Sequence, residues 1–311
     1  MADLRYKWNV VGHSHQLREL EQDLSSQNLA HAYLFAGPGH VGKFSLAKKL
    51  AQILQCENGF CQTCSVCLEV LKGYHPDTMI MDDDGGAITI EQMREVLHRL
   101  YSTTPGKYKI LLAKNIERMT LEAANALLKT LEDPPPQVIF LLTSSHPDEL
   151  LKTILSRVRT YAFRPLDAEE LKTFLRQRYP ERSADDLAIA GELAFGKPGK
   201  AFAYFEDQEH FDKAKALYNE VTALVKKPDM LARFAAIAEL AKEKENSLTK
   251  DFLDVFLLVL RYKMLDEVRE PGAEHAIPKT LKTLADAQRA RNLLKRNVNT
   301  RLLFENLMLE V

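Results

Sequence analysis

The sequence predicts an α/β domain built on a parallel sheet, followed by a small helical domain and a larger all-helical one. Three observations lead to this prediction. Short apolar runs alternate with amphipathic stretches in the first half of the chain, a glycine-rich loop follows the first run, and the C-terminal part shows only helical periodicity. Continuous apolar runs separated by helices are typical of a parallel sheet that is covered on both faces.

Four apolar runs are the candidate strands of the sheet. Each is four or five residues long and is bounded by loop residues: YLFA (33–36), DTMIM (77–81), KILLA (109–113) and VIFLL (138–142). Helical spacing of apolar residues separates these runs, so we expect β–α units whose strands run in parallel. The predicted α/β domain covers residues 1–163.

Helical signals dominate after Pro165. We predict a small helical domain at 164–205 and an all-helical C-terminal domain at 206–311. In the C-terminal domain, apolar residues recur at i, i+3, i+4, i+7 and i+8, which is the spacing of one helix face. These residues are Phe252, Val255, Phe256, Val259 and Leu260.

Composition excludes several classes of protein. The chain has 311 residues, enough for two or three domains, and a formal net charge of −1. A near-neutral charge excludes bulk attraction to DNA or to an anionic membrane. The N-terminus is charged where a signal peptide would be apolar, and the most apolar run, at 252–260, is shorter than the ~18 residues of a membrane span. We expect a cytoplasmic protein with no membrane partner.

The stretch GPGHVGKFS (37–45) has the pattern of a phosphate-binding loop. Gly37, Gly42 and Lys43 match G-x-x-x-x-G-K and stand between an apolar run and a helical stretch, as this motif requires. Backbone amides at the helix N-terminus and the Lys43 ammonium would hold phosphate oxygens. We predict a degenerate nucleotide site at Gly37, Gly42, Lys43 and Ser45, where binding of ATP or ADP is weak or absent.

Hydrolysis by this chain is not expected, because two groups that hold Mg²⁺ are missing. Phe44 stands where a hydroxyl normally ligates the metal. Ser45 is one residue late, which is ~100° around a helix axis. The run KILLA leads into Lys114 and Asn115, where a hydrolysing enzyme of this class needs a carboxylate.

All four cysteines lie in twelve consecutive positions. Cys56, Cys61, Cys64 and Cys67 form the pattern C-x4-C-x2-C-x2-C. Four thiolates at this spacing suit a tetrahedral Zn²⁺ site, and the absence of a further ligand inside the segment predicts a structural role. Buried free thiols and a redox C-x2-C pair are the alternatives. The predicted zinc knuckle covers 56–67.

Several segments together resemble the bacterial clamp-loader subunits, which are AAA+ proteins of the DNA polymerase III complex. The cysteine knuckle follows the phosphate-loop helix and is itself followed by GYHPD (73–77), EAANALLKTLEDPPP (122–136) and IFLLTSSHPDELLKTILSR (139–157). The resemblance covers residues 1–205. It implies a RecA-like AAA+ domain with a zinc knuckle, a helical lid, and a helical collar for oligomerisation.

Within this family, the chain resembles the delta-prime type, which has degraded ATPase motifs, more than the tau/gamma motor type. Lys114 and Asn115 occupy the positions of the motor's Asp-Glu pair. The resemblance implies a hetero-oligomer with motor (tau/gamma) and delta subunits that loads a sliding clamp onto primer-template DNA.

Ser156 and Arg157 match the family's Ser-Arg-Cys motif, with Val158 in place of Cys. The resemblance implies that Arg157 is an arginine finger, reaching in trans into the ATP site of a neighbouring motor subunit. An Arg in a surface salt bridge is the alternative, and Arg159 and Arg164 are nearby competitors.

Two other functions stay open at this stage. An active tau/gamma-type motor would need Mg²⁺ ligands that the sequence does not reveal. A stand-alone zinc-dependent nucleic-acid-binding module would need a basic and aromatic cluster near the cysteines, which the sequence lacks.

Overall fold

The computed structural model describes residues 4–82, 85–101, 106–226, 246–270, 275–294 and 300–310. Contacts divide the chain into two units. The first unit comprises Met1–Phe174 and Gly196–Gly199, and the second unit comprises Leu175–Phe195 and Lys200–Val311. The predicted division into three domains stays a prediction.

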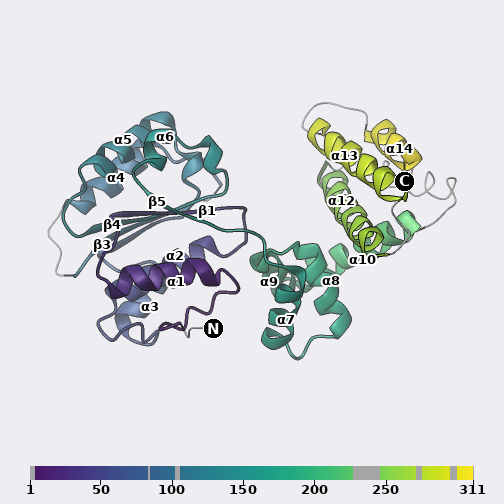
Figure 1. Cartoon of the computed structure of the whole chain (residues 1–311). Coiled ribbons are helices and arrows are strands. Elements are labelled where there is room, and N and C mark those ends of the chain that lie inside the picture. The colour runs from purple at the N-terminus through teal and green to yellow at the C-terminus, as the bar shows by residue number, and fades with distance from the viewer. Residues whose placement is uncertain are drawn as a thin grey trace. The chain divides into compact units, whose positions relative to one another are not determined.

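The first unit contains a five-stranded sheet in which every neighbouring pair is parallel (Figure 1). The strand order is β2-β3-β4-β1-β5. The strands are β1 (Ala32–Ala36), β2 (Thr78–Met81), β3 (Lys109–Ala113), β4 (Val138–Ser144) and β5 (Arg159–Ala162). The predicted α/β fold with a parallel sheet is therefore confirmed.

Strand β5 has no counterpart among the four predicted runs. Its sequence is RTYA, and only Tyr161 is buried. The strand lies at the edge of the sheet and pairs only with β1. An edge strand that buries one side chain has no continuous apolar run, so sequence pattern alone does not reveal it.

Helices cover both faces of the sheet (Figure 1). Alternate strand residues point to opposite faces, so Tyr33 and Phe35 pack in one core and Leu34 in the other. One face is covered by α1 (Ser14–Ser25), α2 (Lys43–Gln55) and α3 (Ser65–Lys72). The other is covered by α4 (Ile90–Leu100), α5 (Leu121–Glu132) and α6 (Lys152–Leu155). Two short 3-10 turns follow β3 and β4, namely η1 (Ile116–Arg118) and η2 (Pro147–Glu149).

A buried carboxylate ties α1 to two strands. Asp23 accepts a hydrogen bond from Arg159 Nη1 at 2.6 Å through Oδ1. Its Oδ2 accepts from the hydroxyls of Tyr33 at 3.3 Å and Tyr161 at 3.2 Å. Burial is the main cause that raises the pKa of Tyr33 to about 12, so this hydroxyl stays a donor. The network fixes the start of β5 against the rest of the sheet.

Replacing Asp23 with alanine is expected to lower the free energy of unfolding of the first unit by about 3 kcal/mol, because two buried hydroxyls and a guanidinium lose their acceptor. Tyr161→Phe is the matched control, since it removes a single donor and should cost about 1 kcal/mol. Urea denaturation of the full chain measures both values. Equal losses for the two variants would contradict the role given to Asp23.

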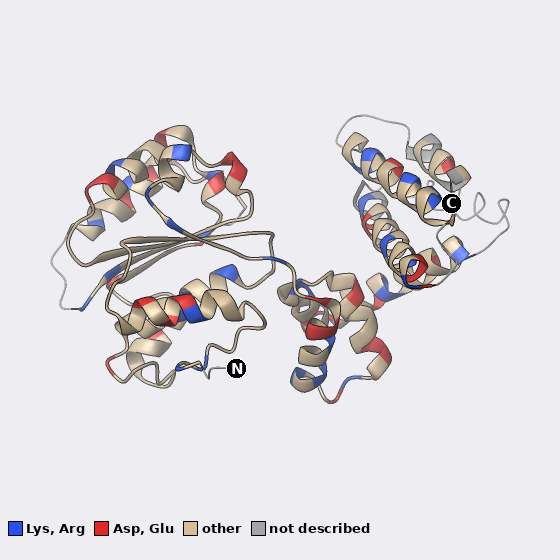
Figure 2. Cartoon of the chain, viewed as in Figure 1, with Lys and Arg blue, Asp and Glu red and all other residues tan. Residues whose placement is uncertain are grey.

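The remaining described elements are all helices. They are α7 (Ala168–Arg178), α8 (Ala184–Ala194), α9 (Pro198–Glu206), α10 (Gln208–Lys226), α12 (Asn246–Arg269), α13 (Ile277–Leu293) and α14 (Thr300–Glu310). Acidic and basic residues are interspersed along the helices of both units (Figure 2). Among the helices that the structure describes, none combines the length and the apolar character required to cross a membrane.

The predicted apolar face in the C-terminal region is confirmed. All five of its residues, Phe252 to Leu260, lie on α12 and are buried. The Phe252 and Phe256 rings stack with centroids 5.9 Å apart, and the Phe304 ring of α14 meets Phe252 edge-on at 5.0 Å. Aromatic contacts therefore join α12 to α14 in the core of the second unit.

Candidate functional site

The predicted phosphate loop lies at the carboxyl ends of β1 and β4, in the centre of the sheet. β1 lies between β4 and β5. The connection that follows β1 leads towards β2, and the connection that follows β4 leads in the opposite direction, to β5. In open α/β sheets, ligands bind in the crevice beyond such a point. Gly37 begins the loop with φ 146°, and a Cβ there would meet Phe163 O at 2.2 Å. Only glycine fits, because the backbone of Phe163, directly after β5, passes so close to the loop.

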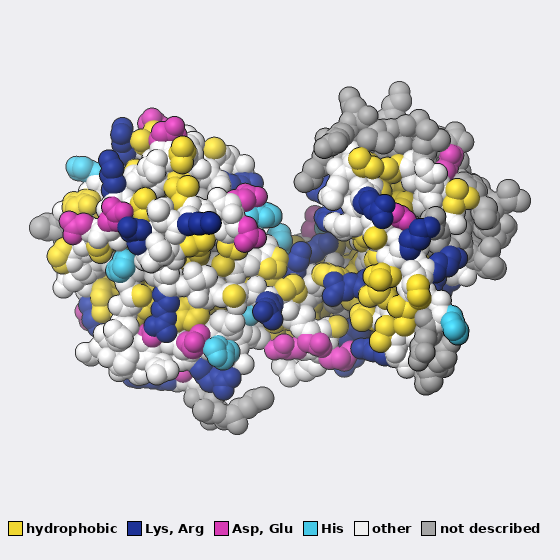
Figure 3. Space-filling view, turned by 45° about the horizontal axis from the view of Figure 1, so that its top comes forward, with side chains coloured by type: hydrophobic (Ala, Val, Ile, Leu, Met, Phe, Trp, Pro, Cys, Tyr) yellow, Lys and Arg dark blue, Asp and Glu magenta, His cyan; other side chains and the backbone are white. Residues whose placement is uncertain are grey.

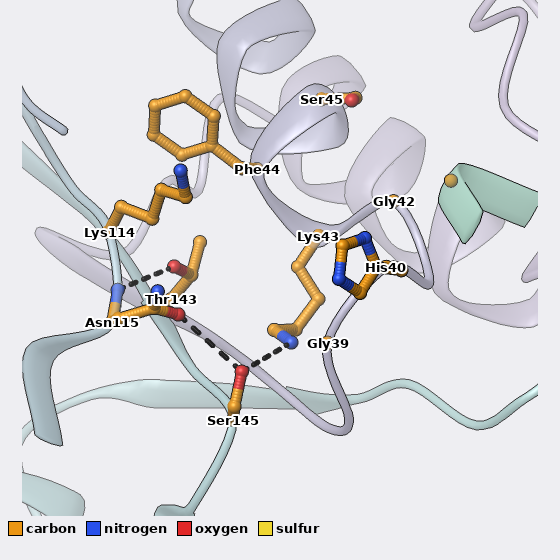
Figure 4. A pocket seen from close by; sticks show the side chains of 11 residues that line it. Gly39, His40, Gly42, Lys43, Phe44, Ser45, Lys114, Asn115, Thr143 and Ser145 are labelled. Atoms are coloured by element: carbon orange, nitrogen blue, oxygen red, sulfur yellow. Dashed lines mark hydrogen bonds between the residues drawn. The ribbon is translucent and has the colours of Figure 1, made fainter. Parts of the chain in front are cut away.

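A cavity of about 340 Å³ opens beside this loop (Figure 4). The α2 side contributes the loop and the first helical turn, while β3 and β4 contribute the residues at their ends. The lining residues are Gly39, His40, Gly42, Lys43, Phe44, Ser45, Lys114, Asn115, Thr143, Ser145 and Gly199. Of the predicted nucleotide-binding residues, Gly42, Lys43 and Ser45 line the cavity, and Gly37 shapes the loop.

Lys43 is buried at the base of the cavity and bonded to its own loop. Its Nζ donates to the carbonyl oxygen of Gly37, to that of Pro38 at 2.7 Å, and to Ser145 Oγ at 3.3 Å. Burial lowers the pKa of Lys43 to about 8, and the nearby Glu117 carboxylate acts in the opposite direction. The ammonium is thus anchored between the loop and the end of β4.

Phe44 and Lys114 line the part of the cavity where a hydrolysing site would hold Mg²⁺. Lys114 Nζ lies 5.4 Å from the centroid of the Phe44 ring, and Lys48 Nζ lies at the same distance from it. Lys114 also forms an ion pair with Asp82 Oδ1 at 2.6 Å. Ser45 is exposed and lies on the other side of the first turn of α2 from Phe44 (Figure 4). An ammonium and an aromatic ring offer no ligand atom to a divalent cation.

The sequence patterns did not predict several residues of this site. Thr143 Oγ1 accepts a hydrogen bond from Asn115 N at 3.1 Å, and Ser145 Oγ donates to Asn115 Oδ1 at 3.4 Å. Ser145 N donates to Glu117 Oε1 at 2.9 Å. The available signal was the polar triplet TSS directly after an apolar run, since polar side chains at a strand end often line a ligand crevice.

The four cysteines come together in a single cluster. Their Sγ atoms all lie within 4.8 Å of one another. Cys56 Sγ is 3.8 Å from Cys61 Sγ and 3.9 Å from Cys64 Sγ. Tetrahedral Zn²⁺ with Zn–S bonds of about 2.3 Å places its sulfurs about 3.8 Å apart. The donor set fits a structural zinc ion, which Cys56, Cys61, Cys64 and Cys67 would hold.

Backbone amides stabilise thiolates in this cluster. Cys64 N donates to Cys61 Sγ at 3.3 Å, and Cys67 N donates to Cys64 Sγ at 3.4 Å. Hydrogen bonds from the backbone of Thr63 and Cys64 are the main causes that lower the pKa of Cys61 to about 6. A low thiol pKa favours metal binding, because the thiolate is the ligand.

The cluster is attached to the core of the first unit. Cys56 ends α2 and Cys64 begins α3, so the knuckle joins these two helices. Gln52 Nε2 donates to Cys67 O at 2.8 Å, and Phe60 packs its ring 6.4 Å from that of Tyr6. A metal held here would stabilise the turn between α2 and α3.

Ser156 and Arg157 lie at the C-terminal end of α6. Arg157 Nη2 pairs with Glu132 Oε1 at 2.9 Å, and its Nη1 donates to Thr153 O at 2.9 Å and to Ser156 Oγ at 3.2 Å. The Arg157 side chain is 35% exposed. Arg159, one of its competitors, is held by the buried Asp23 instead. Neither Ser156 nor Arg157 lines the cavity beside the phosphate loop.

Comparisons with known proteins agree with these features. A family model described as DNA polymerase III, delta subunit, matches residues 12–167. The DNA polymerase III subunit delta' of Pseudomonas aeruginosa is 30% identical over 308 residues, covering 90% of this chain and 91% of that protein. The DNA polymerase III subunit tau of Escherichia coli is 38% identical over 169 residues, covering 53% of this chain and 26% of that protein. This chain thus spans about a quarter of the tau relative's length.

One solved structure supports the fold. The crystal structure of a DNA polymerase III gamma subunit-related protein from Thermotoga maritima superposes with a TM-score of 0.50 at 17% identity, covering 93% of this chain and 97% of that one. The predicted α/β fold class with a parallel sheet is confirmed. With a family model matched across half of its length and a delta' relative aligned along nearly all of it, this chain belongs to the delta-prime family of DNA polymerase III clamp-loader subunits.

Proposed function

We infer that this chain is an ATPase-deficient subunit that supplies Arg157 in trans to the ATP site of a neighbouring motor subunit. It would act in a complex with tau/gamma-type and delta subunits, which opens a sliding clamp and places it on primer-template DNA. The chain itself has no catalytic cycle in this proposal. Its α/β unit serves as a rigid neighbour for the subunit that hydrolyses ATP.

The contact between Phe44 and Lys114 is the observation that carries this proposal. A hydrolysing site needs Mg²⁺ bound by a hydroxyl after the loop lysine and by a carboxylate at a strand end. Here the ring of Phe44 and the ammonium of Lys114 lie 5.4 Å apart in those two places. A positive charge at the metal position repels a divalent cation, so the reaction lacks its main source of charge neutralisation.

The surroundings of Arg157 support its role as the finger. Its partner Glu132 is 48% exposed, and an exposed ion pair is worth only about 0–1 kcal/mol. The guanidinium can exchange this carboxylate for a phosphate at little cost. Arg159 is less suited, because leaving Asp23 would break a buried network. Ser156 Oγ accepts from Arg157 Nη1 and would help to aim it.

Exposed apolar side chains support a role of the second unit in assembly. Hydrophobic side chains lie among the charged ones on the surface of this unit (Figure 3). Among the described side chains of α12, α13 and α14, the large hydrophobic residues that are exposed include Leu265, Val268, Leu281, Leu293 and Leu309. Apolar residues exposed on several adjoining helices are suited to contacts between subunits.

The isolated chain is expected to show no Mg²⁺-dependent ATP turnover above the background of a Lys43→Ala variant. A steady-state phosphate-release assay with both proteins measures this. Lys43→Ala is the matched control, since it removes the loop lysine and leaves Phe44 and Lys114 in place. Turnover that requires Mg²⁺ and disappears in Lys43→Ala would identify an active motor instead and would contradict the proposal.

A further inference from the structure

We propose that the cysteine knuckle is a latch for the N-terminal strap, which we define as residues 4–10, and that the latch opens when the four cysteines lose their metal. This inference rests on the zinc ion predicted at the cluster, and it is independent of the role proposed for Arg157. It gives the knuckle a task beyond the turn between α2 and α3. The residues that perform this task are Phe60 and Gln62, which flank the ligand Cys61.

Two contacts join the strap to the knuckle. The Phe60 ring meets the Tyr6 ring edge-on with centroids 6.4 Å apart, and Tyr6 meets Trp8 in the same way at 6.0 Å. Gln62 Nε2 donates a hydrogen bond to Lys7 O at 3.3 Å. Trp8 and Phe60 are both buried. A row of aromatic rings therefore runs from the knuckle to the buried tryptophan, and edge-on pairs of this kind are favourable beyond the area that they bury.

Polar side chains of α1 and α2 hold the strap from its other side. Glu21 accepts hydrogen bonds from Arg5 N at 2.8 Å, from Tyr6 N at 2.8 Å and from Trp8 Nε1 at 2.9 Å. Lys49 Nζ donates to Trp8 O. These bonds require no metal. The strap is thus attached on two sides, and only the knuckle side depends on the cysteines.

The end of the strap reaches the phosphate loop. Val10 Cγ1 lies 3.9 Å from the position that a Cβ on Gly42 would take. Directly after the strap, His13 Nε2 lies 3.2 Å from Val41 O. The strap therefore connects the knuckle, at the C-terminal end of α2, with the phosphate loop at the N-terminal end of the same helix.

The backbone of the knuckle explains why its contacts with the strap need the metal. Phe60 and Gln62 have φ values of 72° and 63°, in the left-handed region that residues other than glycine rarely adopt. Such a conformation persists only where the surrounding structure enforces it. Cys61 lies between the two residues, so a metal bound to its sulfur would fix both backbones at once. Without the metal, the loop relaxes and the Phe60 and Gln62 side chains leave the strap.

Trp8 reports on the latch, because it is the only tryptophan of the chain. Its fluorescence is measured on the full chain before and after zinc removal by a chelator, well below the melting temperature, together with the zinc content. We expect zinc removal to raise acrylamide quenching of Trp8 several-fold and to shift its emission to longer wavelength. Re-addition of Zn²⁺ should reverse both changes.

Two results of this measurement would overturn the proposal. Unchanged Trp8 fluorescence after complete release of zinc would overturn the latch and leave the metal site intact. A purified chain without zinc would overturn the latch together with the metal site. The zinc content distinguishes the two cases, and neither bears on ATP turnover or on Arg157.

Hydrogen exchange separates local opening from unfolding. After zinc removal, the backbone amides of residues 4–10 should exchange several-fold faster, whereas those of β3 and β4, inside the sheet, should keep their protection. Equal acceleration in the strap and in both strands would mean that the first unit unfolds as a whole, and would contradict a latch.

Phe60→Gly separates the latch from the metal. Glycine adopts left-handed backbone without strain, so this variant should keep its zinc although it lacks the ring that contacts Tyr6. Quenching of Trp8 in the zinc-bound variant should rise towards the value of the zinc-free chain. If this variant fails to fold, Gln62→Gly gives the same test with a smaller increase, because it removes one hydrogen bond and no ring.

Leu68→Ala is the matched control, since Leu68 is exposed on α3, next to the ligand Cys67. It removes an apolar side chain from the same segment and should leave both the zinc content and the quenching of Trp8 unchanged. A zinc-bound Phe60→Gly chain whose quenching equals that of the unmodified chain would overturn the proposal. Equal effects of Phe60→Gly and Leu68→Ala would overturn it as well.

Discussion

In a reconstituted clamp-loader complex, Arg157→Ala is expected to slow ATP hydrolysis by about 10³–10⁵-fold at the motor site that faces this subunit. The guanidinium neutralises charge that develops on the transferring phosphoryl group, and alanine leaves that charge uncompensated. The measurement is a single-turnover assay on a complex in which only this site is competent. Arg157→Lys should restore little of the rate, because an ammonium lacks the planar fork of donors.

Arg164→Ala is the matched control for Arg157, since Arg164 is also exposed and lies seven residues further along the chain. It should leave the rate and the assembly of the complex unchanged. ATP affinity at the motor site should be similar in all variants, since the finger acts on the transition state. An unchanged rate with Arg157→Ala would mean that another residue serves, and equal effects of both variants would point to a general loss of surface charge.

Loss of the zinc ion that we predict at the cysteine cluster is expected to have the second large effect. Cys64→Ser should release the zinc and lower the melting temperature of the first unit by ~10 °C or more, because binding of structural zinc contributes directly to folding. Serine is a good helix N-cap, so this variant keeps the cap of α3 that Cys64 now provides and isolates the loss of the ligand. Elemental analysis and a thermal melt with and without a chelator give both quantities.

Ser65→Ala is the control for the zinc prediction, since Ser65 is exposed and adjacent to Cys64. It should retain one zinc ion per chain and a melting temperature close to that of the unmodified protein. A purified chain without zinc would overturn the metal site. Unchanged zinc content and stability in Cys64→Ser would show that Cys64 is not a ligand.

The sheet was largely predictable because four of its strands carry continuous apolar runs. Strands β1, β3 and β4 are buried at every position, and burial on both faces selects such runs. Strand β2, at the other edge of the sheet, is buried at two of its four positions and partly buried at the other two, which was enough to keep its run apolar. The fifth strand, β5, is an edge strand whose polar side chains face solvent. Its position depends on the network around Asp23, which joins residues 136 positions apart at Arg159.

The residues of the candidate site that lie in one consecutive stretch were also predictable, whereas those that the fold brings together were not. Gly37, Gly42 and Lys43 are recognisable because a phosphate loop is one consecutive stretch with fixed backbone requirements. Ser145 was missed, because its contact with Lys43 joins residues 102 positions apart and follows from the pairing of β1 with β4. Glu117 reaches Ser145 N for the same reason.

Short-range patterns were enough to predict a phosphate loop without Mg²⁺ ligands and a cysteine knuckle of metal-binding spacing. Such features depend on residue type and on spacing along a few positions. Tertiary structure alone shows that Lys114 lies against Phe44, and that the buried Asp23 holds Arg159 while Arg157 pairs with the exposed Glu132. These contacts join residues of separate elements. Strand order and helix packing bring those elements together, and no local sequence pattern encodes either of them.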